Sequence, residues 1–195
     1  HELALIVADA AGIDIGFVPY KGGKAATLAG LQGEVDIAGG GVHEHVDLIR
    51  AGKLRCLQQT SDKDITLADG TVLPTVGKML PDLASLLPIG PQYNLVMKRD
   101  TPVEVLREIK EAFVAAVESD AFMKIAESQY FTIDVRTGDA ADKRAAQLEA
   151  LTAATFRKYS GQIKGTVKSP AELGLPEPKD FDKWWPPQGY SKLDV

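Results

Sequence analysis

Residues 13–53 read IDIGFVPYKGGKAATLAGLQGEVDIAGGGVHEHVDLIRAGK, and this stretch decides the predicted fold. Short apolar runs of strand character alternate with segments of helical periodicity, and glycines separate them. Because the connections are only two to six residues long, the pattern predicts parallel βαβ units with right-handed crossovers. The expected strands are 13–20, 35–38 and 54–59, and the expected helices are 24–32 and 42–51.

The flanking sequence extends this α/β pattern in both directions. A helix is expected at 2–11, a polar turn region with an Asp69-Gly70 turn at 61–75, and a short helix at 75–80 before Pro81 breaks the pattern. Thr101, Pro102 and Glu104 predict a capped helix start. The remaining expected elements are strands at 93–98 and 131–135 and helices at 120–128 and 139–159, followed by a proline-rich tail.

A change of composition between residues 88 and 101 marks the expected crossover between two lobes. We therefore expect residues 1–95 to form most of one lobe and residues 96–195 to return to the other. A connection this short is typical of a hinge rather than of independent domains.

Bulk composition excludes several classes of function. The 195 residues are 45% apolar and 25% charged, which is typical of a globular protein. A net charge of -5 without any run of basic residues argues against nucleic-acid binding. No apolar stretch approaches the roughly 18 residues of a membrane span, so we expect none. Cys56, the single cysteine, lies in an apolar run and is expected to be a small core residue.

The residues with most chemical potential lie where two glycine turns open helices. Helix N-termini carry unpaired N–H groups and a partial positive charge, and glycine lets an anion approach the backbone closely. In an open α/β sheet such ends face the ligand site. The alternative is that the glycines merely permit tight turns. The candidate backbone contacts are Gly22, Gly23, Lys24, Gly40, Gly41 and Val42.

Side-chain candidates are fewer. Tyr20 ends the first strand and His43 begins the second helix, so each is a candidate ligand contact. His43 and His45 are two residues apart on a helix and point to different sides, so we expect no shared metal. We identify no catalytic residue and expect no cofactor. Trp184, Trp185 and Tyr190 form either a sugar or partner platform or a staple that holds the tail.

Several motifs in order resemble the Bug family, the TctC-like solute receptors of tripartite tricarboxylate transporters. The resemblance rests on the strand end "VPYKGG" at 18–23, the "GEVD" turn at 33–36 and the helix end "IRAGKLR" at 49–55, and continues with "LPT" at 73–75 and Thr101-Pro102. It covers about residues 1–160. The chain departs from the family at Gly39-Gly40-Gly41, where a bulkier or acidic residue is usual.

The resemblance implies an α/β fold like that of type II periplasmic binding proteins, a two-lobed flytrap. It implies a receptor rather than an enzyme, located in the periplasm, which captures a di- or tricarboxylate or a related small acid and hands it to membrane transporter subunits. The helix at 2–11 has no cap before it, so we expect part of one lobe, its anion loop and a signal peptide to lie upstream of His1.

Two other classes of function remain open at this point. An α/β enzyme fragment could use the same glycine-led helices to hold a phosphate or another anion. The ligand-sensing domain of a transcription regulator shares the flytrap architecture, and would carry a helix-turn-helix in its upstream sequence.

Overall fold

The computed structural model describes residues 2–163 and 165–193, so His1 lies outside it. The chain divides into two compact units. Unit 1 consists of Leu3–Gln92 and Ile125–Thr132, and unit 2 consists of Glu2, Tyr93–Lys124 and the chain from Ile133 onward. The candidate site lies within unit 1.

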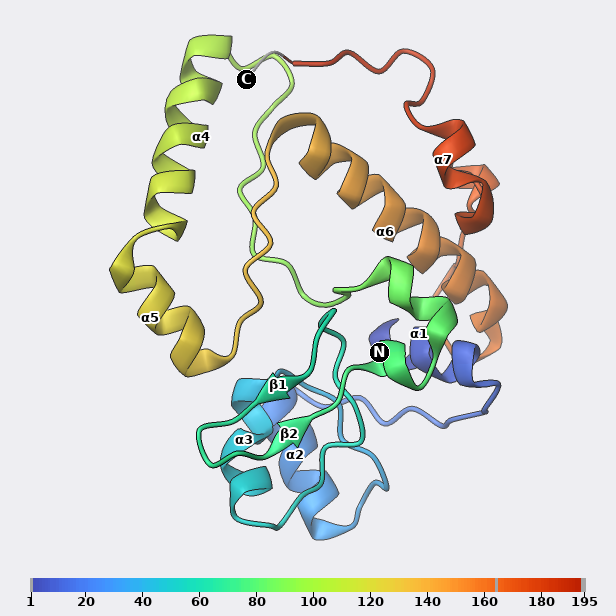
Figure 1. Ribbon diagram of the computed structural model, residues 1–195. Helices are drawn as coiled ribbons and strands as arrows, with labels where there is room; N and C mark the ends of the chain where they lie inside the picture. The colour runs from blue at the N-terminus through green and yellow to red at the C-terminus, as the bar shows by residue number, and fades with distance from the viewer. Residues whose placement is uncertain (1, 164, 194–195) are drawn as a thin grey trace. The chain divides into compact units, whose positions relative to one another are not determined.

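The described residues are mainly helical, and each element is labelled in Figure 1 or lies between labelled ones. The α-helices are α1 Glu2–Ala11, α2 Gly23–Gln32, α3 Val42–Arg50, α4 Val103–Val117, α5 Asp120–Gln129, α6 Gly138–Lys158 and α7 Phe181–Trp184. The strands are β1 Ile65–Thr66 and β2 Val72–Leu73. The 3-10 helices are η1 Val76–Lys78, η2 Pro81–Leu86, η3 Ser160–Gln162, η4 Ala171–Leu173 and η5 Pro178–Asp180.

The helices predicted at 2–11, 24–32, 42–51, 120–128 and 139–159 are confirmed to within a residue at either end. Their ends follow local chemistry. Helix α2 stops because Gly33 adopts a left-handed conformation with φ 76°, which side-chain-bearing residues rarely enter. The next residue, Glu34, then donates its N–H back to the Ala29 carbonyl at 2.9 Å and closes the helix.

The predicted parallel sheet is wrong for the described residues. The segments 13–20, 35–38, 93–98 and 131–135 contain no paired strand, and 54–59 contributes one parallel bridge from Gln59 to Thr75. Several of their apolar side chains are exposed, with Val18 at 57% and Ile37 at 61%. Alternation of apolar residues predicts which face a strand would bury, but a ladder also needs a neighbouring strand in register.

A hairpin replaces the polar turn region predicted at 61–75. Strands β1 and β2 pair antiparallel, with Ile65 opposite Leu73 and Thr66 opposite Val72. The predicted Asp69-Gly70 turn connects them: Gly70 donates to the Leu67 carbonyl, and Asp69 accepts from the Thr71 N–H at 2.9 Å. Asp-Gly between apolar residues is a hairpin signal, which identifies this pair from sequence.

The hairpin closes a small core in unit 1 around Val46, Leu67 and Leu73. Half-buried side chains pack against these three residues: Val42, Ile49, Cys56, Ile65 and Tyr130. Cys56 therefore is the core residue that its sequence context predicts, and burial raises the pKa of its thiol. This core fixes one face of α3 and leaves its N-terminus to the candidate site.

Two predicted helix boundaries are wrong. Pro81 does not break the pattern but occupies the first turn of η2, where its missing N–H costs nothing. The residue before α4 is Pro102 rather than Thr101, and its backbone, at φ -53° and ψ 138°, provides no side-chain cap. Proline has fixed φ but no hydroxyl, so this helix starts without the predicted capping box.

Unit 2 places its buried residues on α6 and α7, chiefly Ala150, Ala153 and Phe181. The tail that follows α6 is held by aromatic contacts. The ring of Tyr190 lies 5.0 Å from that of Trp185, and its hydroxyl lies within hydrogen-bond distance of Asp139 and Asp142 on α6, at 2.8 and 2.9 Å, so that the two carboxylates share its one proton. These contacts support the staple rather than the platform. Across the described part of the chain, no helix has the length and apolarity that crossing a membrane requires.

Candidate functional site

The two glycine turns identified in the sequence meet at one side chain, that of Glu44. Helices α2 and α3 lie side by side in unit 1 (Figure 1). A Cβ built on Gly23 would lie 1.8 Å from Oε2 of Glu44, and one built on Gly40 would lie 2.7 Å from the same atom. Only glycine leaves room for the carboxylate at both positions. We call Gly23, Gly40, Gly41 and this carboxylate the glycine cradle.

The carboxylate is held by the backbone of the turn before α3. The Gly41 N–H donates to Oε2 of Glu44 at 2.7 Å, and Gly41 is the N-cap residue of the helix. A glutamate at the third helical position that reaches back to the N-cap N–H is half of a capping box. Its negative charge also lies at the positive end of the helix, which stabilises it there.

His45 links α3 to α2 behind the cradle. Its Nδ1 lies 2.8 Å from Oγ1 of Thr27, and the Thr27 hydroxyl donates to the Gly23 carbonyl at 2.7 Å. That hydroxyl has one proton, so this arrangement assigns the proton of the second contact to Nδ1 of His45. Burial lowers the pKa of His45, although the Glu44 charge acts in the opposite direction. The ring is therefore neutral near pH 7.

His43 lies at the start of α3, as the sequence predicts, but on another side of the helix from His45. Its ring stands edge-on to Phe131 at 5.6 Å, and it fills the space where a Cβ on Gly41 would lie, 2.5 Å from its Cε1. The side chain is exposed. The structure thus brings His43 beside the cradle and separates it from His45.

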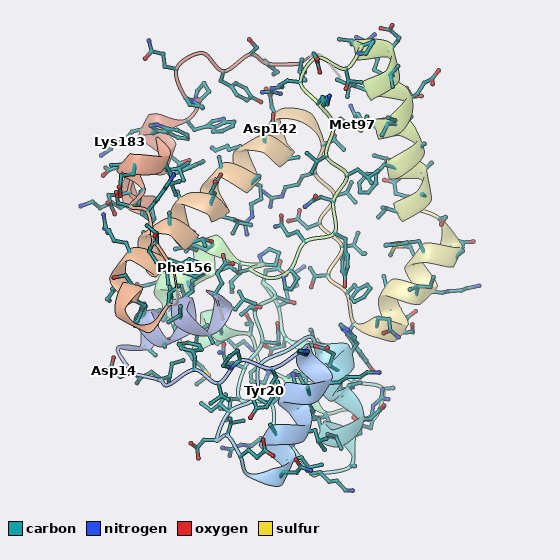
Figure 2. The ribbon with its side chains drawn as sticks, turned by 180° about the vertical axis from the view of Figure 1, so that it is seen from behind. Asp14, Tyr20, Met97, Asp142, Phe156 and Lys183 are labelled. Atoms are coloured by element: carbon teal, nitrogen blue, oxygen red, sulfur yellow. The ribbon has the colours of Figure 1, made fainter. Side chains whose placement is uncertain are left out.

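The other predicted residues surround the start of α2. Tyr20, labelled in Figure 2, precedes α2 in the chain, and its hydroxyl donates at 3.2 Å to Oε2 of Glu34, which follows the other end of the helix. Desolvation, and then the hydrogen bond and charge of Glu34, raise the pKa of Tyr20. Gly22 and Lys24 are exposed. Val42 packs its side chain against the core, so only its backbone faces the site.

The two helix ends differ in the donors they offer. At α2 the first bonded amide is that of Ala26, which donates to the Gly22 carbonyl at 3.3 Å. The N–H groups of Gly23, Lys24 and Ala25 precede it and have no carbonyl within the helix to bond. At α3 the Gly41 N–H is already bonded to Glu44. The α2 end therefore offers more donors to an incoming anion, although the Glu44 carboxylate also lies close against Gly23 there.

Two further observations limit the chemistry. Among the described residues, no group of three or more His, Cys, Asp or Glu side chains could hold a metal ion. The side chains at the cradle are Glu44 and the histidines, whose contacts are a helix cap, a threonine and a phenylalanine. This arrangement can bind and orient a small polar molecule.

Sequence reasoning missed Glu44, Thr27 and His45. The spacing Gly41-x-x-Glu44 was a signal for Glu44, because a glutamate three residues after an N-cap is half of a capping box. Nothing in the sequence signals the contact between Thr27 and His45. It exists because α2 packs on α3, and packing between helices is not encoded in local spacing.

Comparison with known proteins identifies the family. The family model for the tripartite tricarboxylate transporter family receptor, TctC, matches residues 1–163, which is most of the chain. Comparisons with curated proteins and with solved structures find no significant match. The family consists of periplasmic solute receptors with a fold like that of periplasmic binding proteins, which bind small ligands and serve membrane transporter subunits. The match contains the glycine cradle and both of its helices, and the chain belongs to this TctC receptor family.

Proposed function

We propose that the protein is a periplasmic receptor that captures a small organic acid through one carboxylate at the N-terminus of α2. The observation that supports this proposal is the start of α2, where the N–H groups of Gly23, Lys24 and Ala25 precede the first helical hydrogen bond and Gly22 and Lys24 are exposed. Backbone N–H groups at a helix start, beside a cation, are a suitable environment for a carboxylate.

The residues that we propose to contact the ligand are those identified from the sequence at the starts of α2 and α3. Gly22, Gly23 and Lys24 contact the carboxylate of the ligand, and Tyr20 lies beside them. Gly40, Gly41, Val42 and His43 form the opposite edge of the same site. The protein carries out no reaction on the ligand, since the family members are binding receptors.

The mechanism that we propose is a change in the population of two states. The ligand stabilises one of the two states, and the membrane subunits of the transporter recognise that state. A ligand can shift this equilibrium only by its difference in affinity for the two states, so contacts made in that state alone provide the signal.

Isothermal titration calorimetry on the full-length protein tests the proposal. The panel contains malonate, succinate, glutarate, malate and citrate, with glucose, inorganic phosphate and putrescine as competitors of other classes. At least one carboxylate is expected to bind with a dissociation constant in the micromolar range, because few groups of the protein contact the ligand. Binding of phosphate, sugar or amine in the absence of any carboxylate binding contradicts the proposal.

A matched pair of variants locates the site. Lys24→Gln removes the cation beside the α2 amides and is expected to weaken carboxylate binding several-fold. Lys53→Gln removes an equally exposed cation from the far end of α3 and is expected to leave binding unchanged. Equal effects of the two substitutions would show that total charge, rather than the α2 end, attracts the ligand.

A further inference from the structure

The glycine cradle already contains an anion, and this anion belongs to the chain. Oε2 of Glu44 accepts the Gly41 N–H at 2.7 Å and lies close against Gly23 and Gly40. A ligand carboxylate placed at the α3 end would compete with Glu44 for this N–H group. It would also lie beside a like charge, and two carboxylates in one site repel each other.

A second polar atom lies in the same place. Nε2 of His45 is buried and has no hydrogen-bond partner among the residues described. It lies 2.8 Å from the position that a Cβ on Gly40 would take. The Glu44 carboxylate thus places an acceptor between the two helix starts, beside the N–H groups that begin α2.

We propose that Glu44 is a specificity-determining residue, and that it selects acids in which a hydrogen-bond donor takes the place of a second carboxylate. This inference rests on the proposed function, because it needs one ligand carboxylate at α2. The group that faces Glu44 is then a primary amide, an ammonium or a hydroxyl. Monoamides of dicarboxylic acids are the simplest members of this class.

The geometry gives the preference a physical reason. A ligand amide or ammonium that faces Glu44 donates to a charged acceptor, which is about twice as strong as a neutral hydrogen bond. When a dicarboxylate of the same shape binds, its second carboxylate loses its water of hydration and finds no hydrogen-bond donor at Glu44. A buried or half-buried site built around acceptors rejects a ligand that lacks the donor, because the acceptors are left unpaired.

Calorimetry with pairs of probes that differ in one group tests the inference. The pairs are succinate with succinamate and glutarate with glutaramate, in which an NH₂ replaces one carboxylate oxygen. The protein is expected to bind the monoamide about tenfold more tightly than the diacid, which corresponds to one hydrogen bond to a charged group. In Glu44→Gln the amide of the new side chain can donate, and the preference is expected to reverse toward the diacid.

Two further variants keep the result interpretable. Asp47→Asn removes the same charge from an exposed position one turn along α3 and is expected to leave the preference unchanged. Gly40→Ala places a Cβ 2.7 Å from the Glu44 carboxylate and displaces it, so the preference is expected to shrink while the charge remains. A circular dichroism melt establishes whether Glu44→Gln folds. If it does not, Gly40→Ala still tests the position of Glu44.

The outcomes separate the two proposals. If no carboxylate or monoamide binds, the proposed function is wrong and the specificity inference is wrong with it. If the diacids bind the unmodified protein as tightly as the monoamides, the receptor function stands and the role of Glu44 is refuted. A preference for monoamides that survives both Glu44→Gln and Gly40→Ala refutes it as well, because another residue then provides the selection.

Discussion

The glycine cradle of unit 1 and the Tyr190 cluster of unit 2 both contain acidic side chains, but they satisfy them in different ways. In the cradle, Glu44 is bonded by a backbone N–H between close glycines. In the Tyr190 cluster, Asp139 and Asp142 accept from the Tyr190 hydroxyl, while Arg99 pairs with Asp142 and lies over the Tyr190 ring at 4.8 Å.

The difference separates a binding arrangement from a structural one. Around Tyr190, side chains of this chain supply both donors and acceptors, so the cluster closes on itself. Its effect is to raise the pKa of Tyr190 to about 12, chiefly through desolvation. At the cradle, the α2 amides and Nε2 of His45 leave hydrogen-bonding capacity that a ligand can use. Substitutions should therefore affect binding at the cradle and stability at the Tyr190 cluster.

The largest expected effect comes from filling the cradle. Gly23→Val places a branched side chain where Glu44 Oε2 lies, 1.8 Å from the new Cβ, and covers the first amides of α2. We expect carboxylate affinity to fall by at least tenfold, with a smaller effect on the free energy of unfolding, because the group that must move is the flexible end of Glu44. Calorimetry and urea unfolding measure the two quantities.

The control for this substitution is Gly16→Val in the same unit. A Cβ on Gly16 meets nothing within 4 Å, and its backbone is not in the left-handed region. Binding and stability are expected to stay close to those of the unmodified protein. If Gly16→Val weakens binding as strongly as Gly23→Val, the cradle has no special role.

The next effect is on stability alone. Tyr190→Phe keeps the ring beside Trp185 but removes the hydroxyl that donates to Asp139 and Asp142. Hydrogen bonds to charged groups contribute about 1.5–3 kcal/mol each when buried, and this cluster is half-buried. We expect the free energy of unfolding to fall by about 1–2 kcal/mol while carboxylate affinity is unchanged. Weaker carboxylate binding in Tyr190→Phe would show that the Tyr190 cluster contributes to ligand binding as well as to stability.

A smaller effect follows from the pH dependence of His45. Burial lowers its pKa below the ordinary value of 6.5, so the folded state binds fewer protons than the unfolded state as the pH falls through 6.5. Stability should therefore decrease from pH 7.5 to 5.5, by no more than about 1 kcal/mol. Glu44 opposes the shift and His43 adds to it.

His45→Gln should flatten the dependence measured by thermal melts at closely spaced pH values, and His43→Gln should reduce it only in part, because His43 contributes to the shift of His45. The acids with lowered pKa values, among them Asp64 and Asp69, titrate below their ordinary value of 3.8 and act in a lower range. If the stability of His45→Gln still falls between pH 6.5 and 5.5, a group other than His45 causes the pH dependence.

The helices could be predicted from sequence, because their ends depend on local signals. Gly33 ends α2 through its own backbone conformation, and Gly41 and Glu44 start α3 through a capping box. The strands could not be predicted in this way. The segment 13–20 alternates like a strand, yet pairing depends on a partner elsewhere in the chain, and Val18 is 57% exposed.

The residues of the candidate site likewise fall into those that local sequence identifies and those that depend on tertiary packing. Gly23, Gly40 and Gly41 were found because glycine before a helix has a known physical meaning. The contact between His45 and Thr27 was not, since it joins residues 18 apart through packing of α2 on α3. That Glu44 fills the cradle also depends on tertiary structure: its cap to Gly41 is local, whereas its approach to Gly23 is not.

The smallest expected effects come from the ion pairs that accompany the Tyr190 cluster. Lys192 lies 3.3 Å from Asp139, and Lys143 lies 3.1 Å from Asp182, with side chains that are 78% and 46% exposed. Exposed pairs contribute about 0–1 kcal/mol because solvent screens them and ordering the side chains costs entropy. Lys192→Ala and Lys143→Ala should each change the free energy of unfolding by less than about 0.5 kcal/mol in urea titrations, with less effect still at high salt. If either loss equals that of Tyr190→Phe, surface charge rather than the Tyr190 hydroxyl fastens the tail to α6.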